Sequence, residues 1–161
     1  MEKKIGLTIG KYAPFHKGHE YLINKALKEV DLLYIFIYET NVIDIDIDIR
    51  TEWIKEILKD KNIKIIKIYN TPSQYGMDET SIKIQLDCII ENLRKIGNPK
   101  ITHFYSSEEY GKYVAEALNA ENIIVDKKRM NIPVNATDIR KDLESYKKYL
   151  NKIVYEDLKN R

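Results

Sequence analysis

The sequence is poor in cysteine and in net charge, and both shortages exclude classes of protein. The one cysteine, Cys88, lies in an apolar run with Leu86, Ile89 and Ile90, which predicts a buried structural thiol rather than a nucleophile and indicates a reducing, cytoplasmic setting. Lys and Arg number 27 against 25 Asp and Glu, and the net charge of +2 gives no global field that would recruit nucleic acid or an anionic membrane. Any basic binding site is therefore local.

Long apolar runs and linkers are missing too. No apolar stretch approaches the ~18 residues of a membrane span, and residues 1–5 carry no apolar signal-peptide region, so we expect no membrane partner. No internal repeat, low-complexity tract or Pro/Gly/Ser-rich linker divides the chain. With 161 residues, the chain is expected to form one domain over 1–161, and the sequence leaves open whether that domain forms a homo-oligomer.

Apolar residues recur with alternating strand and helix periods. Residues 31–38 form a continuous apolar and aromatic run, as expected of a central strand covered on both faces. We therefore expect an α/β fold, with a single doubly wound, Rossmann-like sheet of five parallel strands and a C-terminal helical closure. The expected strands lie near residues 5–9, 31–38, 63–68, 101–105 and 123–125, and the expected helices near 19–30, 49–59, 81–96, 108–118 and 136–150.

The turn after the first strand carries a concentration of chemically active residues. It contains two of the three histidines, His16 and His19, together with Lys11, Gly10 and Gly18. Glycines let backbone approach a phosphate, a helix N-terminus offers N–H groups, and two imidazoles spaced i, i+3 can donate to the same anion. Neither a G-x-G-x-x-G nor a P-loop pattern is present. The turn therefore predicts an anion site of another kind, beyond the carboxyl ends of the strands.

Other interpretations of the histidines are weaker. A zinc pair lacks visible third and fourth ligands, a purely structural pair fits the strand–turn–helix context less well, and we place no metal-binding residue in the site. His103 lies within an expected strand and is predicted to be structural. The Ile/Asp alternation of residues 43–48 matches no familiar metal loop, and an edge strand or a solvated arm explains it equally well.

A second anion-binding element is expected near residues 134–140. Asn135 or Thr137 can cap a helix start and leave backbone N–H groups aimed at phosphates, and Arg140 adds a forked donor one turn later. Taken alone, this segment would be an ordinary N-cap with a solvated arginine. Together with the first turn it indicates a polyphosphate site.

These segments resemble the HxGH nucleotidyltransferase superfamily. Residues 16–19 match the HxGH element, and the longer string G-K-Y-A-P-F-H-K-G-H is most similar to the NadR-type nicotinamide mononucleotide adenylyltransferases. Arg50 with Trp53 resembles the R-x-x-W element of that family, and residues 105–108 resemble its S-S-E element. Residues 134–140 are similar to its I-S-x-T-x-I-R motif, so the resemblance covers nearly the whole chain.

The resemblance implies a role for each matching residue. His16 and His19 would bind the triphosphate of ATP and stabilise the transition state, while Lys11 and Arg140 would neutralise the β- and γ-phosphates. Mg²⁺ carried by the triphosphate would offset the charge of the leaving group. The residues implied to frame the nucleotide are Gly10, Phe15, Gly18, Ser106, Ser107, Asn135, Thr137 and Ile139. Those expected to hold the acceptor are Arg50, Trp53, Tyr75 and Gly76.

The implied reaction transfers AMP from ATP to a small phosphorylated acceptor, nicotinamide mononucleotide, and yields NAD and pyrophosphate. The sequence departs from the family at Asn135, where Ser is usual, and in residues 73–78, which lack the tryptophan expected to stack nicotinamide. Because the chain ends at Arg161, we expect it to lack the riboside kinase domain often attached in that family.

Two alternatives stay open. One is a cytidylyltransferase acting on a small alcohol phosphate, although the R-T-x-G-I-S-T-T string of that branch is missing, and the other is a catalytically inactive nucleotide-binding sensor.

Overall fold

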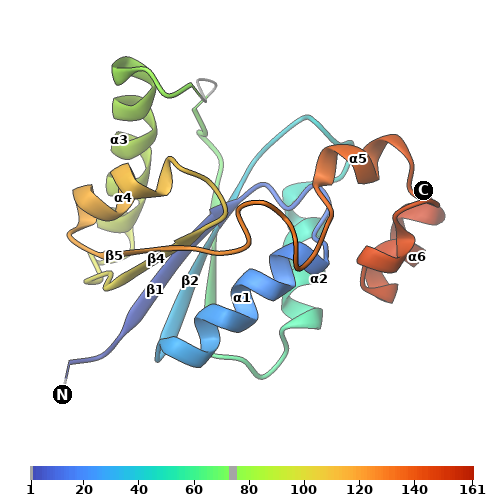
Figure 1. The fold of residues 1–161 in the computed structure, drawn as a ribbon, viewed down its shortest axis with the longest axis horizontal. Helices are drawn as coiled ribbons and strands as arrows, with labels where there is room; N and C mark the ends of the chain where they lie inside the picture. Colours follow the sequence, from blue (N-terminus) through green and yellow to red (C-terminus); the bar gives the residue numbers. More distant parts are fainter. Residues whose placement is uncertain (1, 73–75) are drawn as a thin grey trace.

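A five-stranded parallel sheet forms the centre of the molecule (Figure 1). The computed structural model describes residues 2–72 and 76–161. The strands lie in the spatial order β3-β2-β1-β4-β5, and every neighbouring pair is parallel, which confirms the predicted doubly wound sheet. The strand order reverses at β1, so the carboxyl ends of β1 and β4 border the crevice where such sheets bind ligands. The strands are β1 (Ile5–Gly10), β2 (Leu32–Tyr38), β3 (Ile63–Ile68), β4 (His103–Ser106) and β5 (Glu121–Ile124).

The sequence of β2 explains why both faces of the sheet are covered. Successive side chains of a strand point to opposite faces, and all six residues from 33 to 38 are buried. Those at 33, 35 and 37 belong to a core cluster that includes Ile23 and Trp53, whereas those at 34, 36 and 38 belong to one that includes Ile89 and Val114. An unbroken apolar run therefore buries itself against two layers of helices.

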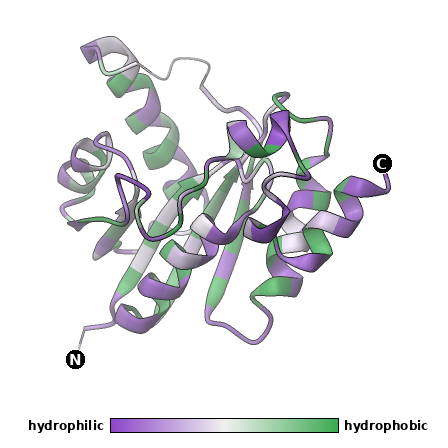
Figure 2. Ribbon diagram, turned by 45° about the vertical axis from the view of Figure 1, so that its right-hand side comes forward, coloured by the Kyte–Doolittle hydropathy of each residue, from purple (hydrophilic) through white to green (hydrophobic). Residues whose placement is uncertain are grey.

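Helices cover the two faces unequally. The side chains of α3 and α4 contribute to one core, while α1, α2 and the C-terminal helices contribute to the other. Figure 2 shows hydrophobic residues along the central strands and hydrophilic ones on the outer turns of the helices. Within the described ranges, no helix is both long and apolar enough to cross a membrane. The helices are α1 (Lys17–Glu29), α2 (Ile47–Ile57), α3 (Glu79–Lys95), α4 (Gly111–Leu118), α5 (Ala136–Lys141), the short 3₁₀ helix η1 (Lys147–Tyr149) and α6 (Lys152–Lys159).

The C-terminal closure is present, but the single helix predicted over residues 136–150 is wrong. Asp142 ends α5 in a non-helical conformation (φ −151°, ψ 82°), and its carboxylate accepts hydrogen bonds from the amide (3.2 Å) and the hydroxyl (2.6 Å) of Ser145. Such a local turn competes with helical hydrogen bonds. Ile139 and Leu150 still reach the same core, but from separate elements.

Two smaller predictions need correction. Cys88 is half-buried rather than buried, with its thiol 3.9 Å from the carbonyl of Asn70. Of the two alternatives for the Ile/Asp alternation, the edge strand is absent and the arm is present: Ile45 and Ile47 are buried, the three aspartates of residues 43–48 are exposed, and Asp46 caps the start of α2. This segment, residues 39–48, is called the acidic arm below.

Candidate active site

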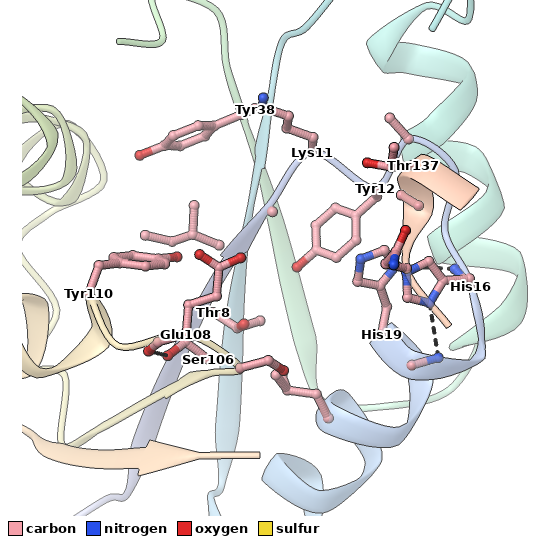
Figure 3. Close-up of a pocket in the computed structure, with 18 of the residues that line it drawn as sticks. Thr8, Lys11, Tyr12, His16, His19, Tyr38, Ser106, Glu108, Tyr110 and Thr137 are labelled. Carbon is pink, nitrogen blue, oxygen red and sulfur yellow. Dashed lines mark hydrogen bonds between the residues drawn. The ribbon is translucent and has the colours of Figure 1, made fainter. Parts of the chain in front are cut away.

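A cavity of about 680 Å³ opens where β1 and β4 end (Figure 3). Its volume lies within the range of small-molecule binding sites, about 300–1,000 Å³. The first turn, the end of β4, the loop after β5 and the start of α5 all contribute to its wall. Of the predicted site residues it brings together Gly10, Lys11, His16, Gly18, His19, Ser106, Ser107, Asn135, Thr137 and Arg140.

His16 and His19 lie stacked in the cavity wall, with ring centroids 3.7 Å apart (Figure 3). His16 is the N-cap of α1, which begins two residues earlier than predicted. Its Nδ1 accepts a hydrogen bond from the Gly18 amide (3.0 Å), and the Nδ1 of His19 accepts one from the His16 amide (3.1 Å). Because Nδ1 accepts in both neutral rings, the proton of each ring is on Nε2. The pair therefore offers two uncharged N–H donors.

The surroundings keep both imidazoles neutral. Burial lowers the pKa of His16 to about 3, with a further contribution from the positive charge of Arg129. Burial also lowers the pKa of His19 well below its usual range, followed by the effects of His16 and Arg129. Neither ring is protonated near neutral pH, so their donors do not depend on titration in that range.

We expect the free energy of unfolding to fall as the pH decreases from about 6.5 towards 3, since His16 binds a proton there only in the unfolded chain. Because the pKa of His16 is lower in the folded chain than in the unfolded chain, its contribution to stability is complete above pH 6.5 and is lost as the pH falls towards 3. The loss reaches up to about 1.4 kcal/mol per pH unit for one proton. Urea unfolding at stepped pH measures the slope. His16→Asn keeps a capping oxygen without a titrating ring and should reduce the slope, leaving the contribution of His19; equal slopes in the variant and the wild type would contradict the assignment.

Cationic side chains surround the cavity beside the histidines. The guanidinium of Arg140 donates to the Ala13 carbonyl (2.8 Å) and to the Thr137 hydroxyl (3.3 Å), which fixes it over the first turn. Burial, followed by the charge of Arg140, lowers the pKa of Lys11, and the carboxylate of Glu108 acts in the opposite direction. The two predicted cations are therefore close enough to act on one anion.

Several lining residues were not anticipated from the sequence. They include Arg129 from the loop after β5, Glu108 and Tyr110 from the segment after β4, and Tyr12 and Tyr38, whose rings face the cavity (Figure 3). Arg129 stands in the basic run of residues 127–129, which is the one signal that pointed towards it. The aromatic residues have no distinguishing spacing in the sequence.

Two predicted nucleotide-binding residues lie beneath the cavity rather than in its wall. Phe15 is fully buried and stacks against His19, with ring centroids 5.7 Å apart and an interplanar angle of 6°. Ile139, on the inner face of α5, is also buried in the core. Both support residues that do line the cavity.

The predicted acceptor-binding residues are more scattered. Arg50 is 1% exposed, and its guanidinium donates to the carbonyls of Ile45 (3.1 Å), Tyr38 (3.1 Å) and Lys11. Arg50 and Lys11 also line a second hollow, of about 960 Å³, formed by the acidic arm and residues 69–72. The arginine thus fastens the acidic arm to the first turn.

Trp53 lines neither of the two hollows. It is 3% exposed in the core, and its indole Nε1 donates to Asp157 of α6 (2.8 Å). Gly76 lies near the wall of the first cavity, where its carbonyl accepts a hydrogen bond from the side chain of Gln85 (3.3 Å), while Tyr75 lies outside the described residues.

Among residues 2–72 and 76–161, no three His, Cys, Asp or Glu side chains form a group that could hold a metal ion.

Comparison with proteins of known sequence finds adenylyltransferases among the relatives. The chain is 26% identical over 166 residues to the "Trifunctional NAD biosynthesis/regulator protein NadR" of Escherichia coli K12, covering 93% of this chain but 39% of that protein. It is 36% identical over 66 residues to a phosphopantetheine adenylyltransferase of Mycoplasma capricolum, covering 39% of this chain and 47% of the relative. The chain therefore spans less than half the length of these curated relatives.

Solved structures share the fold. A NadR protein in complex with NAD and AMP-PNP superimposes with a TM-score of 0.66 at 22% identity, over 93% of this chain and 45% of that one. A bifunctional NMN adenylyltransferase/ADP ribose pyrophosphatase from Francisella tularensis gives 0.66 at 20% identity, over 94% and 44%. A family model described as the citrate lyase ligase C-terminal domain matches residues 6–156. Because that match covers almost the whole chain, the protein belongs to the citrate lyase ligase C-terminal domain family, and the resemblance of the chain to the HxGH nucleotidyltransferase superfamily is confirmed.

Proposed function

We propose that the protein transfers an adenylyl group from MgATP to nicotinamide mononucleotide, forming NAD and releasing pyrophosphate. One observation carries the proposal: two neutral imidazoles, fixed as Nε2–H donors, face a cavity that also holds Lys11 and Arg140. Preorganised donors of this kind stabilise charge that develops on phosphate oxygens. The names of two relatives, the NAD biosynthesis protein NadR and a phosphopantetheine adenylyltransferase, support an adenylyl transfer reaction.

The reaction requires no protein nucleophile. A phosphate oxygen of the acceptor attacks the α-phosphorus of ATP, a new P–O bond forms, and the bond from the α-phosphorus to the bridging oxygen breaks, so that pyrophosphate leaves with the electron pair. His16 and His19 donate hydrogen bonds to the phosphate oxygens on which negative charge grows, while Lys11 and Arg140 offset the charge of the leaving group. Mg²⁺ enters as part of the nucleotide substrate.

The second hollow supports an acceptor with both a phosphate and a cationic group. Lys11 and Val42 line both hollows, so a phosphate held by Lys11 in the second hollow would lie beside the triphosphate. The other charged residues of that hollow are acidic: Glu39 and the three aspartates of the acidic arm. The positively charged pyridinium of nicotinamide mononucleotide suits this charge, whereas the extra carboxylate of nicotinate mononucleotide does not.

A substrate screen tests the proposal. We expect magnesium-dependent pyrophosphate release from ATP with nicotinamide mononucleotide, and weaker release with nicotinate mononucleotide. Small alcohol phosphates and CTP serve as the competing acceptor and nucleotide. Equal or better turnover with CTP would overturn the adenylyl assignment in favour of a cytidylyltransferase. ATP binding without turnover of any acceptor would instead identify a nucleotide-binding sensor.

A further inference from the structure

The loop between β5 and α5 is held in one conformation by a single carboxylate. Asp126 accepts hydrogen bonds from three successive backbone amides, those of Met130 (2.8 Å), Asn131 (3.0 Å) and Ile132 (2.9 Å). Three charge-assisted bonds to one side chain define the path of the loop. The backbone within residues 126–132 is therefore built in advance of any ligand.

Arg129 lies inside this loop in a left-handed conformation (φ 52°), which residues other than glycine rarely adopt. The bonds to Asp126 stabilise that conformation and so direct the side chain. Its Nη1 donates to the Val134 carbonyl (2.8 Å), and the residue lines the cavity together with His16 and His19. After burial, the positive charge of Arg129 also contributes to lowering the pKa of both histidines.

The two basic neighbours of Arg129 do not share this placement. Lys127 forms an ion pair with Glu109 on the surface, and Lys128 is exposed. Neither lines the cavity. Of three consecutive basic residues, the loop thus directs one towards the histidines.

We propose that Arg129 binds the polyphosphate of the nucleotide as a third fixed cation beside Lys11 and Arg140, and that Asp126 positions it. A guanidinium carries five N–H donors, so the bond to Val134 leaves donors for phosphate oxygens in a forked geometry. Because Arg129 lines the same cavity as the imidazole pair, phosphates bound at those rings lie within reach of the guanidinium as well. This inference rests on the proposed function only for the identity of the anion, ATP as substrate and pyrophosphate as product.

Calorimetric binding of ATP, pyrophosphate and AMP tests the assignment without an acceptor. Arg129→Gln should weaken the affinity for ATP and pyrophosphate by about 10- to 100-fold, the range for losing hydrogen bonds to a charged partner, and should leave AMP affinity within about threefold, since AMP lacks the β- and γ-phosphates. Lys128→Gln is the matched control from the same loop and should change none of the three. An equal loss with Lys128→Gln would overturn the proposal, as would an equal loss for AMP or an unchanged ATP affinity.

Further variants separate contact from folding and from long-range charge. Arg129→Lys keeps the charge without the fork and should recover part of the pyrophosphate affinity. Asp126→Asn loses the oxygen that accepts from Ile132 and should weaken pyrophosphate binding while Arg129 is intact. Histidine titration by NMR gives a readout free of nucleotide: Arg129→Gln should raise the pKa of His16 and His19, and unchanged values would contradict the geometry. If the wild-type chain binds pyrophosphate but transfers nothing, the proposed function fails while the role of Arg129 is still decided.

Discussion

We expect His19→Ala to lower kcat by roughly 10²- to 10³-fold, the usual cost of removing one preorganised donor to developing charge. The Nε2–H of His19 faces the cavity while its Nδ1 accepts from the His16 amide, so the ring is fixed before the nucleotide binds. The loss falls mainly on kcat because the bond strengthens as charge develops in the transition state. Stability should fall by about 1–3 kcal/mol, since the variant loses one hydrogen bond and the ring contacts with His16 and Phe15. Steady-state kinetics and urea unfolding on the same variant check both statements.

His103→Ala supplies the control for that experiment. His103 begins β4, where its Nδ1 lies 2.7 Å from the Thr102 hydroxyl and its Nε2 lies 3.4 Å from Glu121, and it does not line the cavity. Its removal should leave kcat nearly unchanged. If His103→Ala were the poorer enzyme and His19→Ala stayed active, the reacting groups would have to be sought at another end of the sheet.

The parallel sheet could be predicted because its signals are local. The unbroken apolar run of β2 and the amphipathic spacing of α1 each depend on a dozen residues or fewer, and their alternation leaves few topologies. The break at Asp142 could not be predicted in the same way. Ile139 and Leu150 keep a helical spacing and both reach the core, so the periodicity does not distinguish one helix from two elements joined by a turn.

The site was predictable to the extent that its residues are close in sequence. His16, His19 and the first turn form one short string, whereas Arg129 meets them only because β5 and β1 end at the same edge of the sheet. The separation of residues 16 and 129 along the sequence does not predict that they line the same cavity. The side chain of Arg50 illustrates a second limit, since its position at the start of a helix was evident but its bonds to three backbone carbonyls were not.

Trp53→Ala should lower the free energy of unfolding by about 3–5 kcal/mol, the range for truncating a large core aromatic. The indole is 3% exposed, belongs to the core cluster of α1, α2 and α6, and donates to Asp157, so truncation leaves a cavity and removes one of the donors to that carboxylate, which still accepts from Arg161. The KM values for ATP and for the acceptor should both stay within about twofold, because no contact with either substrate is lost. Thermal and urea unfolding measure the first effect, and initial rates measure the second.

Trp53→Phe separates the two contributions of the indole. Phenylalanine keeps most of the apolar volume but removes the N–H that Asp157 accepts, so its destabilisation should be smaller than that of Trp53→Ala. The expectation from the R-x-x-W resemblance, that Trp53 helps to hold the acceptor, for instance by stacking, predicts the opposite result for the same variants. Stacking requires a raised acceptor KM with nearly unchanged stability, so that result would move Trp53 from the core to the acceptor site and require α6 to shift away from α2 during turnover.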